Sequence, residues 1–302
     1  MKSAVITGPT GAIGVALCKE LLKNNVKVYA VCRSDSERLS NIPNGAQIIF
    51  CNLENLDKLK EKIGNSVDAF FHFAWMKTIG DGRNDMYSQN LNVKYTLDAV
   101  HAANDLKCKI FIGAGSQAEF GRVDGKIRAD IPCRPENGYG MAKLCAGNMS
   151  RIECSKFGID FIWTRVLSVY GPYDGKMSMI SSVIRKLLNG EEPELTNGTQ
   201  NWDYIYSQDA AKIFYALSQK GISGKTYIIA NGNSMPLKNY VEILRDEINP
   251  DLSLGFGKIN SPNPVNLDAD ISETIRDIDY VPQTDFATGI RNTIEYVKEL
   301  LK

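Results

Sequence analysis

The chain has 302 residues, of which 43% are hydrophobic and 23% are charged, a composition typical of a folded globular protein. Lysine and arginine together number 35, as do aspartate and glutamate, so the formal net charge is zero. This balance argues against nucleic-acid binding as the main function, because phosphate contacts require a basic excess.

Cysteine and histidine usage narrows the class of protein further. The seven cysteines are scattered without a CxxC pair, which is typical of reduced thiols in a cytosolic protein. His72 and His101 are too few for a histidine-rich site, so no metal is expected. The chain has no apolar run of about 18 residues, and the apolar start Ser3–Ile6 is too short for a signal peptide. We therefore expect a soluble, cytoplasmic protein without membrane contact.

Short β-branched or aromatic runs alternate with longer amphipathic segments through the first two-thirds of the chain. The predicted strands are Ser3–Thr7, Val26–Val31, Gln47–Phe50, Ala69–Phe73, Lys109–Ile112 and Asp160–Val166. The predicted helices between them are Ile13–Leu22, Leu56–Ile63, Asn90–Ala103 and Tyr139–Phe157. Because strands that are apolar throughout are buried on both faces, this alternation predicts an α/β fold with a Rossmann-type, doubly wound parallel sheet.

Beyond about residue 168 the alternation weakens. Prolines and glycines interrupt the sequence at Tyr170–Asp174, Asn189–Pro193, Pro236 and Ser261–Pro264. We expect residues 1–168 to form the sheet domain and residues 169–302 to form mainly a smaller lobe. Residues 203–230 are expected to return to the sheet domain. Open α/β sheets bind ligands at the carboxyl ends of their strands, which is where this lobe should lie.

A glycine-rich segment follows the first predicted strand and opens the first helix. It reads Thr7-Gly8-Pro9-Thr10-Gly11-Ala12-Ile13-Gly14. Its three glycines permit a tight turn, close approach of a pyrophosphate, and close helix–sheet packing, while the helix N-terminus offers free N–H groups. The segment therefore predicts a dinucleotide-binding site formed by Gly8 and residues 10–14, with simple turn glycines as the alternative.

The end of the second strand should contact the adenosine ribose of such a cofactor. There Cys32 is followed by Arg33 and Ser34, a guanidinium and a hydroxyl that suit a 2′-phosphate. We therefore favour NADP(H) as the cofactor. NAD(H) is the alternative, with Asp35 accepting hydrogen bonds from the ribose and Arg33 a solvated charge.

Tyr139 and Lys143 stand at i and i+4 of a predicted helix, and hence on one face. A free phenol has a pKa near 10, which an ammonium and an oxidised nicotinamide would both lower. Lys143 can also hold the nicotinamide ribose. Upstream, Ser116 follows the strand Lys109–Ile112 and a predicted turn, Gly113–Gly115. Its hydroxyl is suited to bind a substrate carbonyl while Tyr139 delivers the proton, so these three residues are the predicted catalytic set.

In this order, the motifs resemble those of the extended short-chain dehydrogenase/reductases, the NAD-dependent epimerase/dehydratase family, over nearly the full length. The matching segments are the loop 7–14, Asn52-Leu53, His72-Phe73-Ala74-Trp75, Asn90-Leu91-Asn92-Val93, the serine segment 115–121, Tyr139–Lys143 and the turn 165–172. The resemblance implies further cofactor contacts from Asn52, Leu53, Phe73, Ala74, Trp75, Asn92 and Val166. It implies substrate contacts from Gln117 and Ser168, and makes His72 a packing or loop residue.

Members of this family oxidise, reduce, epimerise or dehydrate nucleotide-activated sugars. Dehydratases follow the active-site hydroxyl with an Asp-Glu pair, whereas Gln117 and Ala118 lack that acid–base chemistry and Glu119 lies one position late. Because NADPH usually serves reduction, we favour reduction of the 4-keto group of a nucleotide-activated (6-deoxy)hexose. An NAD-dependent nucleotide-sugar 4-epimerase and a non-catalytic dinucleotide-binding regulator are the alternatives.

One departure from the family concerns the substrate diphosphate. The family typically has an arginine before the aspartate of its "RD[YF]IYV.D" motif, whereas this chain has Trp202 there. Tryptophan stacks on a base or sugar but cannot neutralise a phosphate, and plain core packing is equally compatible. Diphosphate contacts would then come from Arg185, Lys186 or Arg276.

The resemblance also bears on assembly. The predicted helices Asn90–Ala103 and Tyr139–Phe157 correspond to those that form a four-helix dimer interface in many relatives. The resemblance to the family therefore implies that the protein is a homodimer.

Overall fold

A seven-stranded parallel sheet forms the centre of the computed structural model, which describes residues 1–261 and 264–302. Pro262 and Asn263, within the predicted proline-rich stretch, lie outside the described residues. The strand order is β10-β6-β5-β4-β1-β2-β3. Their bounds are β1 (Ser3–Thr7), β2 (Lys27–Cys32), β3 (Gln47–Phe50), β4 (Ala69–His72), β5 (Ile110–Ser116), β6 (Asp160–Val166) and β10 (Thr226–Ile229). The order reverses at β1, which lies between β2 and β4, so a crevice for a ligand opens at the carboxyl ends there.

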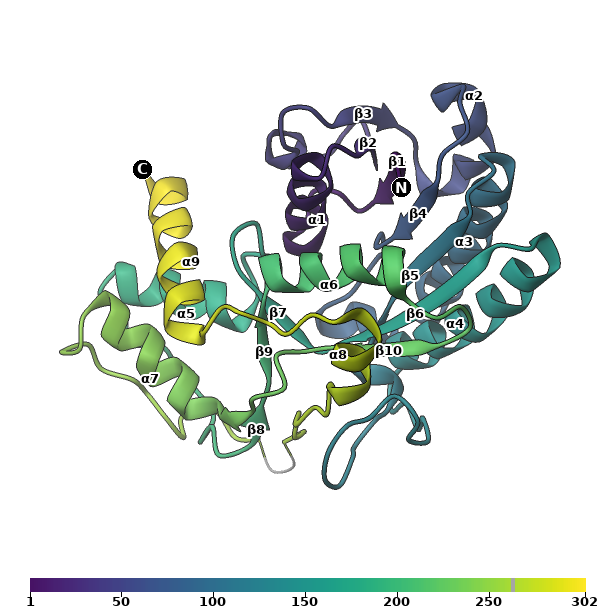
Figure 1. The fold of residues 1–302 in the computed structure, drawn as a ribbon. Coiled ribbons are helices and arrows are strands. Elements are labelled where there is room, and N and C mark those ends of the chain that lie inside the picture. The colour runs from purple at the N-terminus through teal and green to yellow at the C-terminus, as the bar shows by residue number, and fades with distance from the viewer. Residues whose placement is uncertain (262–263) are drawn as a thin grey trace.

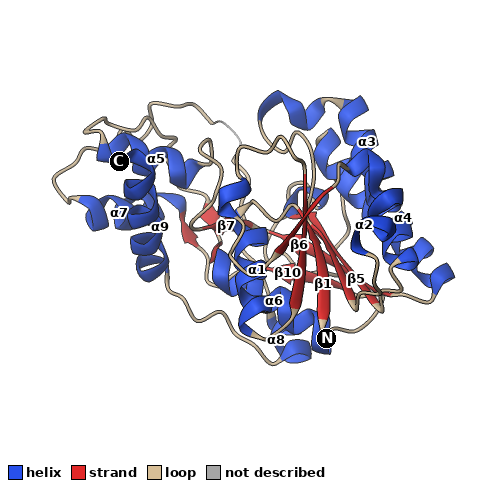
Figure 2. Ribbon diagram, turned by 90° about the horizontal axis from the view of Figure 1, so that it is seen from above, coloured by secondary structure: helices blue, strands red, loops and turns tan. Residues whose placement is uncertain are grey.

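Helices cover both faces of the sheet (Figure 2). One face packs against α2 (Leu59–Ile63), α3 (Met86–Asp105) and α4 (Gly138–Phe157), and the other against α1 (Ala12–Lys23), α6 (Ser207–Lys220) and α8 (Ser272–Ile278). Along β1, Val5 belongs to one apolar cluster while Ala4 and Ile6 belong to the other, because successive side chains point to opposite faces. The predicted doubly wound α/β fold is confirmed.

One strand differs from its prediction. Residues Gly113–Gly115, expected to form a turn, continue β5 as far as Ser116 and pair with β6. The indole of Trp163 on β6 lies against these glycines, and a Cβ added at Gly113 would lie 2.3 Å from its ring. The glycines therefore leave room for a neighbouring indole, and the longer strand carries Ser116 to the carboxyl edge of the sheet.

The C-terminal lobe contains α5 (Met179–Leu188), α7 (Leu237–Ile248) and α9 (Phe286–Leu301), which gather to one side of the sheet (Figure 1). Two short strand pairs join it to the sheet domain: β7 (Ser168–Tyr170) with β9 (Tyr204–Tyr206), and β8 (Asn201–Trp202) with β11 (Met235–Pro236). The lobe has its own apolar core. Residues 203–230 include β9, α6 and β10, so the chain re-enters the main sheet there, after the first part of the lobe.

None of the helices in the described residues combines the length and the apolar character that crossing a membrane requires.

Candidate functional site

The glycine loop between β1 and α1 is shaped by its surroundings. Gly8 has a φ of +71°, and a Cβ there would lie 2.9 Å from the amide nitrogen of Ala74. A Cβ at Gly14 would lie 2.2 Å from the carbonyl oxygen of Gly8. At Gly11, in contrast, an added Cβ would lie 4.0 Å from the Gly8 carbonyl oxygen, an ordinary contact, and Gly11 precedes α1 without a side-chain cap. The first N–H groups of α1 therefore remain available to an anion.

A cavity of about 860 Å³ runs from this loop, past the end of β2, to the turn after β4. The predicted cofactor residues that line it are Gly8, Thr10, Gly11, Arg33, Asn52, Leu53, Phe73, Ala74 and Trp75. Free helix N–H groups at the glycine loop suit a diphosphate, and the volume suits an extended ligand. The residues present thus fit a dinucleotide. Ala12, Ile13 and Gly14 lie within α1 and do not line the cavity.

The end of β2 carries both of the predicted ribose-binding groups. Arg33 Nε lies 3.5 Å from Asp35 Oδ1, and the two side chains are 66% and 75% exposed. Ser34 lines a second cavity of about 280 Å³ together with Lys58 and Lys62. Both cavities share Cys51 and Asn52 at their boundary. This edge of the site therefore contains one acid, Asp35, and three cations, Arg33, Lys58 and Lys62, that could contact a cofactor ribose.

His72 is the last residue of β4 and is fully packed. Its Nδ1 lies 3.0 Å from the Thr7 hydroxyl oxygen, and its Nε2 lies 3.4 Å from the hydroxyl oxygen of Thr96. Burial, with a smaller effect of the Lys143 charge, lowers the pKa of His72 to about 3. A neutral imidazole with hydroxyl partners on both sides joins β1, β4 and α3 and does not carry protons at neutral pH.

The turn after β4 is held by side chains of α3. Asn92 donates to the carbonyl oxygen of Met76 (3.0 Å) and accepts from the Met76 amide (2.9 Å). Trp75 Nε1 donates to Gln89 Oε1 at 2.9 Å. Asn92 does not line the cavity. Its hydrogen bonds to Met76 instead hold the turn that presents Phe73 and Trp75 to the cavity.

Ser116, Tyr139 and Lys143 come together at the carboxyl end of β5. The Ser116 and Tyr139 side chains share a hydrogen bond. Lys143 Nζ donates to the Ala114 carbonyl oxygen at 2.5 Å and lies 3.7 Å from the ring centroid of Trp75. The same Nζ lies 5.8 Å from the ring centroid of Tyr139. The arrangement places a phenol, a hydroxyl and an amine beside the aromatic end of the cofactor cavity.

The start of α4 explains why Tyr139 reaches this position. Asn137 caps the helix by accepting a hydrogen bond from the Gly140 amide at 2.9 Å. A Cβ at Gly140 would lie 2.2 Å from the Ala118 carbonyl oxygen, so only glycine lets the first turn pack on the serine segment. Tyr139 is thereby held against Ser116.

The pKa values at this site differ from the sequence-based expectation. Burial raises the pKa of Tyr139, although the Ser116 hydrogen bond and the Arg83 charge act in the opposite direction. Burial also lowers the pKa of Lys143 to about 7. In the protein alone the Tyr139 phenol is therefore less acidic than a free phenol, because desolvation of the phenolate outweighs the charges nearby.

Glu119 is a residue whose role sequence reasoning missed. Its buried carboxylate accepts from the Ser116 amide (2.8 Å), from Trp163 Nε1 (3.1 Å) and from Arg165 Nε (2.9 Å). It thus points away from the substrate side and fixes the backbone of Ser116 from behind. The spacing Ser116-x-x-Glu119 is a capping box, a signal that the sequence contains. A second missed residue is Arg83, whose guanidinium stacks over the Tyr139 ring and which no motif signals.

Several predicted substrate residues lie near this set. Gln117 directly follows Ser116 in the short helix η4 (Gln117–Glu119), and Ser168 begins β7. Val166, a predicted cofactor residue, pairs in register with Ser116. Trp202 is half-buried between the lobe core and a cluster that contains Phe120, and its Nε1 has no hydrogen-bond partner among the described residues.

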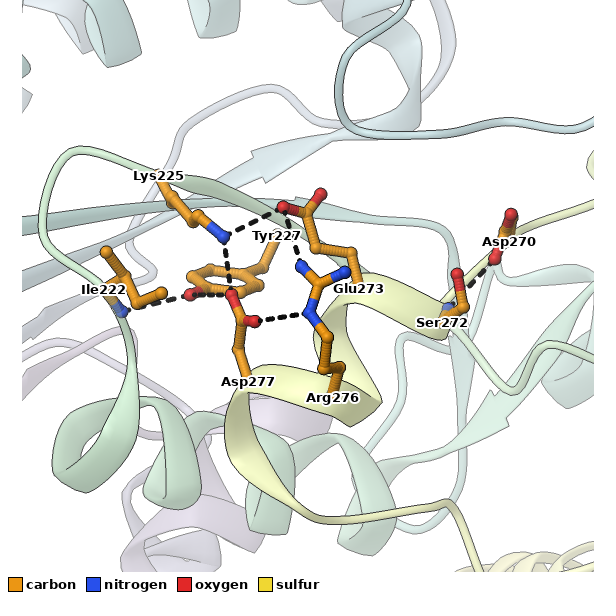
Figure 3. Close-up of polar contacts among 8 residues, drawn as sticks. All are labelled: Ile222, Lys225, Tyr227, Asp270, Ser272, Glu273, Arg276 and Asp277. Carbon is orange, nitrogen blue, oxygen red and sulfur yellow. Dashed lines mark hydrogen bonds and ion pairs between the residues drawn. The ribbon is translucent and has the colours of Figure 1, made fainter.

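Two predicted cations are not brought to Tyr139 by any contact within the described chain. Arg185 lies on α5 near Tyr296 of α9; burial chiefly raises the pKa of that phenol, and the Arg185 charge opposes the rise. The Nε of Arg185 is buried without a hydrogen-bond partner among the described residues. Arg276 instead pairs with Glu273 (3.5 Å) and Asp277 (3.2 Å) on α8 (Figure 3).

The position of Arg276 follows from the helix that carries it. Asp277 also binds Lys225 at 2.7 Å, immediately before β10, and accepts a hydrogen bond from Tyr227 (Figure 3). These contacts lie at the amino end of β10, opposite the edge of the sheet where Ser116 lies. Arg276 is therefore not part of the substrate site that we propose below.

Comparison with known proteins adds to this geometry. The model of the NAD dependent epimerase/dehydratase family matches residues 4–230. The chain is 25% identical to the uncharacterized UDP-glucose epimerase YtcB of Bacillus subtilis (strain 168), over 98% of each protein. Its fold matches UDP-N-acetylglucosamine 4-epimerase from Methanobrevibacter ruminantium M1, solved with UDP-N-acetylmuramic acid, at 24% identity, 99% coverage of each chain and a TM-score of 0.89. It also matches UDP-glucuronic acid 4-epimerase from Bacillus cereus, solved with UDP-glucuronic acid and NAD, at 23% identity, 99% coverage of each chain and a TM-score of 0.87.

Proposed function

Because the chain belongs to the NAD-dependent epimerase/dehydratase family, we propose that it is an enzyme that inverts the C4 hydroxyl of a nucleotide-activated sugar. The observation that carries the proposal is the hydrogen-bonded pair Ser116–Tyr139 beside Lys143 at the end of the dinucleotide cavity. The relative named as a UDP-glucose epimerase and the similar structures named as UDP-sugar 4-epimerases support this reading over ketoreduction, which was the first expectation from the sequence.

A bound nicotinamide dinucleotide supplies the hydride acceptor and donor in this chemistry. Tyr139 would take the proton of the sugar C4 hydroxyl and return it to the same oxygen later. Ser116 would hydrogen-bond that oxygen in both states, and Glu119 keeps the Ser116 backbone in place. Gln117 and Ala118 carry no titratable group, which supports an outcome without dehydration.

Substrate contacts are proposed from the half of the site that faces the lobe. Gln117, Ser168 and the ring of Trp202 would contact the sugar and base. Arg185 remains our proposed cation for the diphosphate, because its buried Nε has no partner among the described residues and a ligand would satisfy it. Asn52 and Leu53 keep their proposed roles as cofactor contacts, whereas Asn92 is proposed to act by holding the turn after β4.

The decisive experiment incubates the purified protein with UDP-glucose, UDP-N-acetylglucosamine and UDP-glucuronic acid, each without added cofactor. We expect the C4 epimer of at least one sugar to accumulate to an equilibrium mixture, with no net consumption of cofactor. A parallel incubation supplies a nucleotide-linked 4-keto-6-deoxyhexose with NADPH, because reduction requires a ketone. Conversion of that ketone with stoichiometric consumption of NADPH would reject epimerisation, and the absence of conversion in both incubations would favour a non-catalytic dinucleotide-binding regulator.

A 4-ketoreductase that uses NADPH is the second candidate. Basic residues near the end of β2 favour it, since Arg33 precedes Ser34 and the cavity lined by Ser34 is also lined by Lys58 and Lys62, which suits a 2′-phosphate. Calorimetric titration of NADP⁺ and NAD⁺ tests this point directly. Tighter binding of NADP⁺, lost in Arg33→Ala, would support the reductase. Tighter binding of NAD⁺ would overturn it and leave Asp35 as the ribose ligand.

The protein is further proposed to form a homodimer through α3 and α4. These helices expose large apolar side chains, among them Tyr87 (88%), Ile152 (52%) and Met141 (51%). Such a surface is typical of a buried interface. Light scattering should give twice the chain mass of 33.5 kDa, and a monomeric mass would reject the dimer.

A further inference from the structure

The segment that carries Arg83 is fixed against the catalytic helix. Arg83 belongs to the short helix η3 (Gly80–Asn84), which follows the turn after β4. Gln89 of α3 donates to the Gly82 carbonyl oxygen at 2.9 Å. Asn84 accepts a hydrogen bond from the Gly138 amide at 3.0 Å, one residue before Tyr139. The two neighbours of Arg83 are thus held by α3 on one side and by the first turn of α4 on the other.

The guanidinium carbon of Arg83 lies 4.7 Å from the ring centroid of Tyr139. In the described part of the chain, Arg83 forms no ion pair with a carboxylate, so its charge is not neutralised by an acid. The other cation of the site is engaged differently. Lys143 Nζ donates to the Ala114 carbonyl oxygen and lies over the Trp75 ring. Of the two cations, Arg83 lies nearer to the phenol ring, at 4.7 Å from its centroid against 5.8 Å for Lys143 Nζ.

Arginine keeps its charge at every pH a protein tolerates, whereas a buried lysine readily loses its proton. In this site, burial lowers the pKa of Lys143 to about 7. Lys143 is therefore largely neutral above that pH until a cofactor or substrate changes its surroundings. A phenolate spreads negative charge over its ring, so a cation above the ring binds the phenolate more strongly than the phenol.

We propose that Arg83 is a positioning residue that supplies the permanent positive charge for the Tyr139 phenolate. The inference rests on the proposed sugar chemistry, in which Tyr139 releases and recovers a proton. The groups that face Tyr139 are Arg83 from η3, Ser116 from β5, Lys143 from its own helix, Trp75 from the turn after β4 and, behind Ser116, the paired Glu119. Glu119 disfavours the phenolate and Arg83 favours it, so removal of Arg83 leaves the acid's influence less opposed.

Two variants separate charge from shape. Arg83→Gln removes the charge at similar length, and Arg83→Lys retains it. We expect Arg83→Gln to move the rising, low-pH limb of the kcat/KM pH profile, which follows deprotonation of Tyr139, upward by about one pH unit, with Arg83→Lys restoring part of the shift. Lys27→Gln is the matched control, because it removes a cation 4.8 Å from the ring of Tyr29, remote from the site. It should leave the profile unchanged.

A second readout does not depend on turnover. Tyrosinate absorbance is titrated in the NAD⁺-loaded protein, and the curve of NAD⁺-loaded Tyr139→Phe is subtracted to isolate Tyr139. The same upward shift in Arg83→Gln would support the inference even if no tested sugar is converted. Superimposable curves for the parent and Arg83→Gln would overturn it. A raised KM with an unmoved pH profile would also overturn it, since Arg83 would then be a substrate contact. Melting temperatures verify that each variant is folded.

Discussion

Two pairs of cations, which lie at opposite ends of the central strands, have opposite kinds of partner. At the amino end of β10, Lys225 pairs with Glu273 at 3.0 Å and with Asp277 at 2.7 Å, and Arg276 joins the same acids (Figure 3). At the carboxyl edge, Lys143 and Arg83 contact aromatic rings, and neither forms an ion pair with a carboxylate among the described residues.

This difference separates stability from function. The ion pairs of Lys225 with Glu273 and Asp277 hold α8 on β10, so removing them should lower the stability of the fold. A buried amine without an acid is destabilising by itself, because burial disfavours its charged form. Such groups occur mainly where a ligand or a reaction needs them. The comparison predicts that substitutions at one edge alter activity and that substitutions at the other alter stability.

The largest effect is expected from Tyr139→Phe, which removes the only hydroxyl proposed to exchange a proton with the sugar. Removing a general acid–base group lowers kcat by about 10²–10⁴-fold. The melting temperature and the binding of NAD⁺ should stay close to those of the parent. Steady-state kinetics and calorimetry measure both quantities. Retention of parental activity would remove Tyr139 from the proton-transfer role.

Lys143→Met should change both the activity of the enzyme and the pH dependence of its stability. We expect kcat to fall by about 10²-fold or more, because the amine that holds the ribose is lost. The folded pKa of about 7 lies below the ordinary value of 10.5, so the unfolded chain binds the extra proton between these values. Stability of the parent relative to the variant should therefore rise from pH 7 to pH 10.5 and be lowest at or below pH 7.

Chemical denaturation of the parent and Lys143→Met across that pH range tests the linkage. A difference in unfolding free energy that does not change with pH would show that the burial of Lys143 carries no proton linkage.

Asp277→Asn, unlike Lys143→Met, should lower stability and leave activity unchanged. The carboxylate is nearly buried and binds Lys225, Tyr227 and Arg276, so its loss weakens three contacts at once. We expect a fall in melting temperature of about 2–4 °C with kcat and KM unchanged. The pKa of Asp277 is lowered chiefly by Lys225, so this stability is present above the ordinary carboxyl pKa and is lost as pH falls through the lowered one. A changed kcat would show that the two edges are not independent.

The smallest effect is expected for Arg276→Ala. Its side chain is 67% exposed, and exposed ion pairs contribute about 0–1 kcal/mol. Melting temperature, kcat and KM should all stay within error of the parent. A KM for the nucleotide sugar that rises severalfold would show that Arg276 contacts the substrate after all.

The sequence predicted the sheet because its signals are local. Apolar strands, the glycine loop and the i, i+4 pair of Tyr139 and Lys143 depend on neighbours along the chain, and the six predicted strands are all present. The exception is Gly113–Gly115, which looked like a turn because glycine is common in turns. Only the indole of Trp163, from an adjacent strand, explains why these positions must lack side chains.

Site chemistry was less predictable from sequence, because pKa values depend on burial and on distant neighbours. By itself the sequence determined the fold class, and it predicted the glycine loop and the set Ser116, Tyr139 and Lys143 on which the proposed function rests. The tertiary structure alone decided that Arg276 faces the wrong edge of the sheet, that Glu119 supports Ser116 from behind, and that Arg83 stacks on Tyr139. Parallel strands bring all carboxyl ends to one edge, but which side chains from the intervening loops reach that edge is fixed only when helices pack around it.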